Sequence, residues 1–589
     1  MRSELMTAVD RWLPTQLPAQ ARTRLIEQMI VDVLREVDEA VGYIPGSVKA
    51  PETAGDLSSP KDEREESESG ENDRADPLAD KLLDRLLYRG VLPRYAFPTD
   101  VAPFYVFNKS LSTLFRPKME FAPAQGLNIA LSQYAPNKQI WIRGKQYTSK
   151  AIYSPYRDER SDAWKKRRLY FECSVCHHAK TELFYEEGLR EVRDCEACRS
   201  ANSFGPAKRW FRPPGFAHPI DREPVTKADE LIESAYATRA KLVMQTPSKS
   251  KAWIAVNDRV RAFPTREYLL VSNSGPDGDG YHYCTGCGRI ESAKDPETNV
   301  FQQHSRPYLS DESEACPGTF TASKIVLGTD FVTDISLFSL SLSPPFRLRP
   351  GNTETNVALR TICEAVAKAA CRMLEIESGE ILAEYRPALT ELGALGTEVE
   401  IFLYDTLSGG AGFSTQLAGR AAELFRNTLG ILSGCPEGCD ASCYRCLRSF
   451  RNKLDHRFLD RKVGEQLLRA ALGGGYPDYP QDRIQGSLNV LFMDLTRQLS
   501  TDFQFERYAD RRTKNASRVR VPILATRRTD QKELWISLAS PVAPGVPVDS
   551  VLRQIESWPS HPVFSIDELM VRTNLPAAVG MVVDQFRSL

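Results

Sequence analysis

The sequence predicts an α+β fold spread over several domains, with short cysteine-rich insertions. A chain of 589 residues is too long to fold around one hydrophobic core. Apolar residues recur at helical spacing near both ends, whereas the alternation typical of strands occurs around residues 139–143 and 519–525. Eleven of the thirteen cysteines fall in three dense groups, a spacing that core packing rarely produces.

The densest group has four cysteines within twelve residues, and these are Cys435, Cys439, Cys443 and Cys446. Thiolates at this spacing can meet at one tetrahedral zinc ion, with no coordination position left for water. The site is therefore expected to be structural. The alternative is four buried or reactive cysteines without a metal, which their clustering disfavours.

Two further groups have the spacing of zinc ligands. Two Cys-x2-Cys knuckles with eighteen residues between them are typical of a zinc ribbon, and they consist of Cys173, Cys176, Cys195 and Cys198. The other predicted site has three cysteines and one histidine: Cys284, Cys287, His304 and Cys316. His282 is an alternative ligand there, whereas His177 and His178 are expected to be exposed. About three structural zinc ions are predicted.

Cysteine usage also bears on the compartment. No secretory signal follows Met1, and no apolar run is long enough to span a bilayer. In a reducing compartment the thirteen cysteines favour metal binding over disulfides. We expect a cytoplasmic protein without a membrane partner, and Cys363 and Cys371 as core thiols of a helix.

Charge is unevenly distributed. Residues 51–76 hold ten acids and three bases, so that the rest of the chain is mildly basic although the total is −1. This acidic segment lacks large apolar residues and is predicted to be a disordered linker. A basic body is compatible with a nucleic-acid partner.

Basic and aromatic side chains interleave in two stretches. Six bases lie within seventeen residues beside the last cysteine group: Arg445, Arg448, Arg451, Lys453, Arg457 and Arg461. A second, weaker strip carries Arg143, Lys145, Lys165, Lys166, Arg167 and Arg168. Such mixtures of side chains can bind the phosphates and stack on the bases of DNA with single-stranded character. The alternatives are a solvated surface and, for Arg461, an ion pair with Asp460 inside the fold.

Catalytic motifs are scarce. The sequence has no nucleotide-binding phosphate loop, so we expect no ATP hydrolysis by the isolated chain. The glycine loop at residues 409–412 follows a strand, and it is interpreted as a packing turn capped by Asp405 rather than as a phosphate site. We assign no catalytic residues. A divalent-metal nuclease using Asp334, Glu380 or Glu384, and Asp405 remains an alternative.

The predicted organisation has seven segments. In order, these are an N-terminal helical segment (1–45), the acidic linker (46–77), an N-terminal α/β region with the basic-aromatic strip (78–170), a zinc ribbon (171–215), a region with the second knuckle (216–326), a zinc-binding domain (327–475) and a small C-terminal α/β domain (476–589). In the last, strands are expected at 519–525 and 534–538. A helix capped by Ser565 and a second helix opened by Pro576 are expected to form a docked helical hairpin rather than a helix-turn-helix.

Several of these motifs resemble known families. The glycine loop, the four cysteines from Cys435 and the following basic residues resemble the C-terminal zinc-binding domain of MrfA-type DNA helicases. The segment Leu92–Val101, the Cys284 knuckle and Trp210–Phe216 resemble DrmB, the family of B subunits of DISARM anti-phage systems. The likeness covers roughly residues 78–472, and no helicase motor is present.

The resemblance implies a chain that is not an enzyme. It implies a DNA-binding and scaffolding subunit that partners a separate, DrmA-like helicase and helps it to engage invading DNA. Two alternatives stay open, a metal-dependent nuclease and a protein-interaction scaffold without DNA contact.

Overall fold

The computed structural model forms two compact units, residues 1–100 and 101–589. It describes residues 17–23, 26, 100–113, 117–225, 239–247, 252–293, 300–309, 315–349, 351–389, 398–473, 475–512, 518–555 and 563–588. In the first unit residues 19–23 are helical. The predicted acidic linker and most of the N-terminal helical segment lie outside the described residues.

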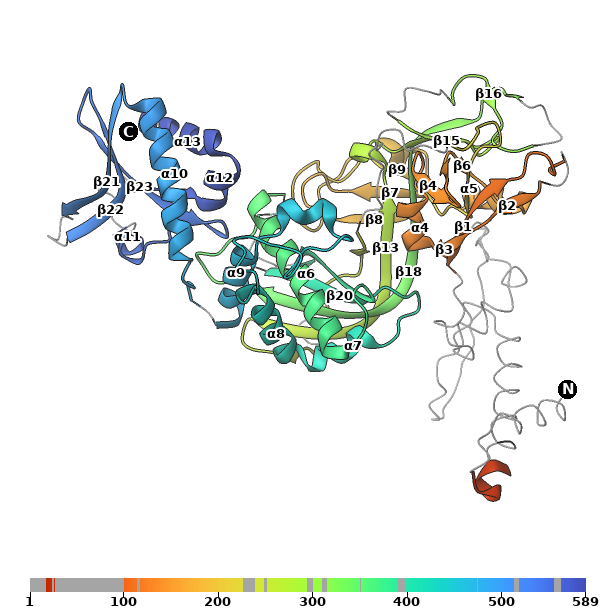
Figure 1. Cartoon of the computed structure of the whole chain (residues 1–589), viewed down its shortest axis with the longest axis horizontal. Coiled ribbons are helices and arrows are strands. Elements are labelled where there is room, and N and C mark those ends of the chain that lie inside the picture. Colours follow the sequence, from red (N-terminus) through yellow and green to blue (C-terminus); the bar gives the residue numbers. More distant parts are fainter. Residues whose placement is uncertain are drawn as a thin grey trace, which may run out of the picture. The chain divides into compact units, whose positions relative to one another are not determined.

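A mixed sheet of eleven strands organises the second unit (Figure 1). Its longest strands, β13 (Val260–Asn273) and β18 (Thr321–Ser341), pair antiparallel along the whole of β13. The other members are β7 (Arg168–Glu172), β8 (Ala179–Leu183), β9 (Lys208–Phe211), β11 (Lys241–Leu242), β12 (Ile254–Ala255), β14 (Tyr281–Cys284), β15 (Ile290–Ser292), β19 (Ile381–Pro387) and β20 (Glu398–Asp405).

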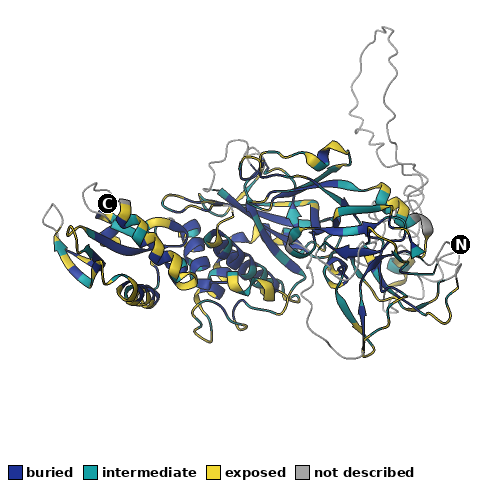
Figure 2. Cartoon of the chain, turned by 90° about the horizontal axis from the view of Figure 1, so that it is seen from above, coloured by how far each residue is buried: buried dark blue, intermediate teal, exposed yellow. Residues whose placement is uncertain are grey.

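Both faces of this sheet are buried, and alternate residues of β18 and β20 point to opposite faces. Phe338 and Ile401 belong to a core shared with four helices, namely α6 (Thr353–Leu374), α7 (Phe413–Gly419), α8 (Ala421–Ser433) and α9 (Arg461–Gly473). Leu337 and Phe402 belong to a core shared with the N-terminal part of the unit. Figure 2 shows the resulting pattern, with buried strands and helices whose outer faces are exposed.

A smaller sheet forms the N-terminal part of this unit. Its strands are β1 (Val101–Phe107), β2 (Met119–Phe121), β3 (Ala124–Gly126), β6 (Ala151–Ile152) and β10 (Phe216–Ala217). Helix α4 (Leu127–Gln133) packs between it and the large sheet, and helix α5 spans Arg157–Lys165. The strand expected near residues 139–143 is confirmed as β4 (Gln139–Ile142), which pairs with β5 (Lys145–Thr148).

The C-terminal part has its own sheet and core. Helix α10 (Gln481–Leu499) packs with α12 (Glu568–Thr573) and α13 (Leu575–Ser588) against the sheet, and α11 spans Ser550–Ile555. Its strands are β21 (Phe503–Arg512), β22 (Arg518–Arg527), β23 (Glu533–Ser540), β24 (Ala543–Pro547) and β25 (Val563–Asp567).

Two expectations about the chain's elements need correction. Ser565 lies in β25, and the side chain of Asp567 instead caps α12 by accepting hydrogen bonds from the backbone N–H groups of Leu569 and Met570. A domain boundary between residues 326 and 327 falls inside β18. The sequence suggests a boundary there because cysteine groups interrupt its pattern at the ends of strands. These strands nevertheless belong to one sheet.

Candidate metal centres and nucleic-acid interface

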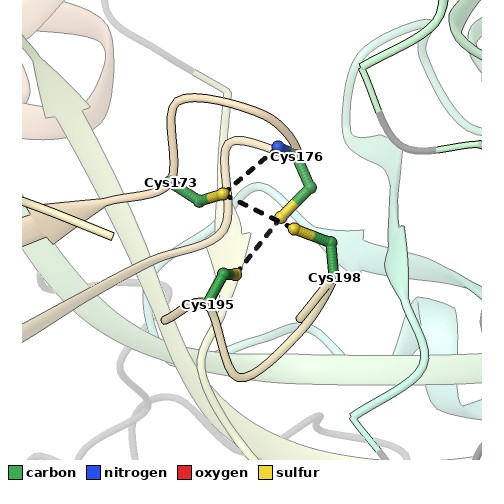
Figure 3. A group of neighbouring side chains, drawn as sticks. All are labelled: Cys173, Cys176, Cys195 and Cys198. Carbon is green, nitrogen blue, oxygen red and sulfur yellow. Dashed lines mark hydrogen bonds between the residues drawn. The ribbon is translucent and has the colours of Figure 1, made fainter. Parts of the chain in front are cut away.

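The first cysteine group lies at the end of β7, where the chain leaves the large sheet. The Sγ atoms of Cys173 and Cys198 are 3.6 Å apart, and those of Cys176 and Cys195 are also 3.6 Å apart (Figure 3). Thiolates around one tetrahedral zinc at about 2.3 Å lie roughly 3.8 Å from each other. The observed separations fit such a site.

The second group joins β14 to two short strands, β16 (His304–Ser305) and β17 (Ala315–Cys316). Sγ of Cys284 is 3.6 Å from that of Cys316, and Sγ of Cys287 is 3.2 Å from Nε2 of His304. The other ring nitrogen of His304 is 2.8 Å from the carbonyl oxygen of Gln302. A hydrogen bond there leaves Nε2 free for a metal, as in many zinc sites.

The third group follows the end of α8. Sγ of Cys435 is 3.5 Å from that of Cys443, and Sγ of Cys439 is 3.6 Å from that of Cys446. The Lys368 ammonium contacts the carbonyl oxygen of Cys446, which places a positive charge beside the thiols.

Each group brings four donor atoms within 4.8 Å of one another, and the residues that the structure describes contain no other such set. Sulfur and imidazole donors suit zinc better than calcium or magnesium. The hydrogen bond between Cys176 and Cys195 lowers the pKa of the Cys195 thiol and raises that of Cys176. Four protein donors leave no open position, so these sites hold the fold together rather than perform chemistry.

The three histidines near the first two clusters differ in their exposure and in their contacts. His177 is exposed, as expected. His178 is buried, and its Nε2 lies 3.0 Å from Glu196, which corrects the expectation of exposure. His282 packs edge-on against Phe301 and is not part of the second donor set.

The basic segment after the third cluster is largely exposed. Arg445, Arg451, Lys453 and Arg457 are exposed, while Arg448 is half-buried and donates to the Ser442 hydroxyl. Two aromatic rings beside them also face solvent, since Tyr444 is 66% and Phe450 80% exposed. The chain beside Cys443 and Cys446 therefore carries cationic and aromatic side chains on its outer surface.

Arg461 departs from this pattern. It is buried, and its guanidinium donates to the carbonyl oxygens of Leu432, Ser433 and Cys439 at 2.8–3.1 Å. It does not pair with Asp460, whose carboxylate instead binds Arg483. Sequence reasoning placed Arg461 with its basic neighbours, but the end of α8 and the zinc loop surround it, so it is excluded from the proposed surface.

The second strip divides in the same way. Arg143, Lys145, Lys165 and Lys166 are exposed. Arg167 lies over the rings of Trp164 and Phe184, and Arg168 forms an ion pair with Asp330 at 2.8 Å. These last two side chains are occupied within the fold.

The glycine loop is confirmed as a packing turn capped by Asp405. The Asp405 carboxylate accepts hydrogen bonds from the backbone N–H groups of Ala411, Phe413 and Ser414 at 2.8–3.0 Å. Asp334 accepts from Gly412 at 2.9 Å, and a Cβ at Gly410, where φ is +71°, would lie 2.0 Å from this carboxylate. The amides of residues 411–414 therefore donate to protein carboxylates, and those of Gly409 and Gly410 donate to backbone carbonyl oxygens, so they are unavailable to a phosphate.

The same contacts bear on the nuclease alternative. Asp334 and Asp405 accept hydrogen bonds from backbone amides of the loop and of the start of α7, and Glu384 pairs with Arg360 and Arg239. Among the described residues these carboxylates form no metal-ligand group with Glu380. The geometry does not support a divalent-metal nuclease at this place.

Sequence reasoning missed a charged cavity between the first cysteine group, α6 and β19. Its residues are scattered between positions 172 and 455. No local pattern marks them, because they come together only through the large sheet. As for membranes, none of the helices formed by the described residues has the length and apolar character needed to cross a bilayer.

Comparison with known proteins places these features in context. Residues 362–447 match the family model of the MrfA Zn-binding domain. The chain is 28% identical over 503 residues to Druantia protein DruE from Escherichia coli (strain UMEA 4076-1). That match covers 82% of this chain and 26% of DruE, so the chain spans about a quarter of its relative's length.

Two solved structures of the DUF1998 helicase MrfA also match. MrfA bound to DNA covers 66% of this chain and 38% of its own, at 9% identity and a TM-score of 0.30. MrfA bound to DNA and AMPPNP covers 63% and 31%, at 10% identity and a TM-score of 0.25. The expectation of a non-enzyme is corrected by these matches, because both neighbours are helicases. At such TM-scores the likeness assigns no activity to this chain.

The matched range starts within α6, later than the boundary at residue 327 expected from sequence, and it ends directly after the last cysteine. It includes the glycine loop, α7, α8 and all four thiols of the third cluster. Residues 362–447 of this chain are thus a MrfA zinc-binding domain.

Proposed function

We propose that this chain is a DNA-binding component of an anti-phage defence system, and that it works with a separate helicase subunit. Its basic segment, defined as residues 444–457 next to the third cysteine cluster, contacts the DNA. A relative in the Druantia defence system and a domain named after a DNA helicase support this proposal. The resemblance to DISARM B subunits is the reason for naming a helicase as the partner.

The observation that carries the DNA contact is the exposure of the basic segment. Its four exposed cations lie on a segment that the cluster anchors at one end, at Cys443 and Cys446. An anchored backbone loses less conformational entropy on binding than a free loop does. Phosphates would meet the cations, and Tyr444 and Phe450 offer faces for unpaired bases.

The test compares two double variants with wild type in DNA titrations at two salt concentrations. Arg445→Ala/Arg451→Ala removes two exposed charges of the basic segment. Arg497→Ala/Arg587→Ala is the matched control, because both side chains are 76% exposed and lie on C-terminal helices. Zinc content is measured first for every protein.

The first variant should bind all DNA sequences more weakly, and the slope of log K against log salt should flatten by roughly one to two units. The control should bind as wild type does. Equal affinities and slopes for the first variant and wild type would exclude the basic segment as a DNA contact. An absence of salt-dependent binding in wild type would favour a protein-interaction scaffold instead.

The partner is tested by co-purification of the tagged chain with the products of its neighbouring genes. A helicase should be retained in stoichiometric amount after a nuclease treatment that removes bridging DNA. Recovery of the chain alone, or loss of the helicase after that treatment, would contradict a direct partnership.

A further inference from the structure

A cavity of about 390 Å³ lies beside the first cysteine cluster. Its walls come from β11, α6, β19 and the short helix η4 (Lys453–Phe458), together with the loop that carries Cys176. Cavities of roughly 300–1,000 Å³ are the usual size for small-molecule sites. The three cysteine clusters and the glycine loop are structural, so none of them explains this space.

The lining is unusually rich in charge for a buried region, with five cationic and four anionic side chains. Glu384 receives Arg360 at 2.7 Å and Arg239 at 3.0 Å, and Lys241 lies 2.6 Å from Glu172. Most of these charges therefore compensate one another. Arg386 is also paired, with the buried Glu400 at 2.7 Å, so the wall is close to neutral.

Two arginines of this wall keep a donor without a partner. Arg360 is 9% exposed and Arg386 is 5% exposed, and both line the cavity. Nη1 of Arg360 and Nη2 of Arg386 are buried and make no hydrogen bond. Guanidinium groups stay charged in proteins and can only donate. A buried donor without an acceptor is destabilising, and more so when it is charged.

Part of the remaining lining is apolar or aromatic. Leu359, Val399 and Phe402 contribute hydrocarbon surface, and Tyr385 contributes a ring. The Tyr385 hydroxyl donates to the Asn356 side chain at 2.9 Å, which holds the ring in place. The cavity thus combines guanidinium groups that have a donor without an acceptor with a surface suited to a flat organic group.

We propose that this cavity binds a nucleotide, with its phosphomonoester at Arg360 and Arg386 and its base against Tyr385. Planar guanidinium forks match phosphate oxygens, and a nucleotide carries both the acceptors and the flat group. The nucleotide is either a free mononucleotide or the 5′-phosphorylated end of a DNA strand. The proposal does not depend on the basic segment.

Binding is measured by calorimetry on the full chain with four probes. These are dAMP, deoxyadenosine, a short single-stranded oligonucleotide with a 5′-phosphate and the same oligonucleotide without it. The expected result is that dAMP binds at least tenfold more tightly than deoxyadenosine. A preference for the phosphorylated oligonucleotide over the unphosphorylated one identifies a strand end as ligand, and its absence identifies the free nucleotide.

Three variants accompany the probes. Ala388→Trp fills the cavity from a wall position, and Ala577→Trp, on the exposed side of α13, is its control. Arg360→Lys keeps the positive charge near Glu384 but loses the planar fork. Ala388→Trp and Arg360→Lys should each weaken dAMP binding at least tenfold, whereas Ala577→Trp and Arg445→Ala/Arg451→Ala should not change it.

Two cavity variants are used because one of them could fail to fold. If the tryptophan of Ala388→Trp disrupts folding, Arg360→Lys still tests the cavity, since it adds no volume. Retained zinc and an unchanged melting temperature qualify each variant for comparison. The proposal is overturned if dAMP does not bind wild type, if deoxyadenosine binds equally well, or if a qualified cavity variant binds like wild type. Loss of DNA affinity alone in the basic-segment variant would leave it intact.

Discussion

Arg461 and Asp567 show how burial changes the role of a charged side chain. Arg461 comes from a run of basic residues, yet it joins the end of α8 to the zinc loop through three carbonyl oxygens. Asp567 caps α12, yet burial, and then the nearby charge of Glu354, raise the pKa of this carboxyl to about 7. Each residue leads to a prediction about stability.

Arg461→Ala should destabilise the protein without acting as a DNA-contact variant. The change leaves the carbonyl oxygens of Leu432, Ser433 and Cys439 without their charged donor, at an expected cost of about 2–4 kcal/mol. Urea denaturation measures the free energy of unfolding. Arg457→Ala is the control, since Arg457 is exposed and should change this free energy by less than about 0.5 kcal/mol. A stability for Arg461→Ala equal to that of wild type would show that these bonds contribute little.

Asp567→Asn should remove a pH dependence. An unfolded aspartate titrates near about 4, so between about pH 4 and pH 7 the folded protein holds a proton that the unfolded chain has released. Stability from this group is fully present below about pH 4 and is lost as the pH rises through about 7. Asparagine keeps the helix cap and cannot ionise. Thermal melting should therefore show a more stable variant at pH 8, with the two proteins converging at pH 4.

Asp584→Asn is the control for that experiment, because Asp584 is exposed and pairs with Arg587 on the surface. It should follow the wild-type pH profile. If Asp567→Asn also follows that profile, its carboxyl ionises normally in the folded protein.

At the scale of elements, the cysteine clusters stabilise segments with little core of their own. The segment around Cys173 to Phe204 has only a small buried cluster, of which three members are its own cysteines. Closed four-donor zinc sites contribute on the order of 10 kcal/mol to local folding. The strands β7, β8 and β9 supply the rest of the support by pairing into the large sheet.

We predict about three zinc ions per chain. Elemental analysis of the purified protein should give this value, and a value of one or zero would contradict it. Cys443→Ser removes one thiolate of the third cluster and should produce mostly insoluble protein, because that cluster holds the loop between α8 and α9. Ser442→Ala, at the adjacent residue, is the control and should remain soluble with full zinc content.

At the scale of the whole molecule, a buried ionic network joins the zinc-binding part of the second unit to its C-terminal part. Arg483 on α10 donates to Asp460 at 2.9 Å and to Glu568 at 3.1 Å. Asp460 also caps α9, and Glu568 further accepts from Tyr479 and Ser487 at 2.7 Å. All of these charged groups are buried, and Arg483 pairs with two carboxylates from different parts of the chain.

Arg483→Met should weaken that junction. Removing the cation leaves Asp460 buried without a cation and Glu568 with only Arg572, 3.9 Å away, and breaking a buried pair in this way typically costs about 3–5 kcal/mol. We expect a lower melting temperature and faster proteolytic separation of the C-terminal part. Arg469→Met, which removes an exposed helix pair with Glu465, is the control. Restoring neutrality with Asp460→Asn and Glu568→Gln in the Arg483→Met protein should recover part of the loss, and no recovery would argue against a charge effect.

Local spacing by itself determined the cysteine clusters, the helix with Cys363 and Cys371, the strands β22 and β23, and the packing role of the glycine loop. These features depend on residues a few positions apart, or on periodicity that one element imposes. Only the tertiary structure decided that Arg461 turns inward, that β18 crosses an expected boundary, and that Arg360 and Arg386 share a cavity with the first cluster. Burial and long-range pairing depend on residues brought together by a sheet whose strands lie far apart in sequence, and no short pattern encodes that meeting.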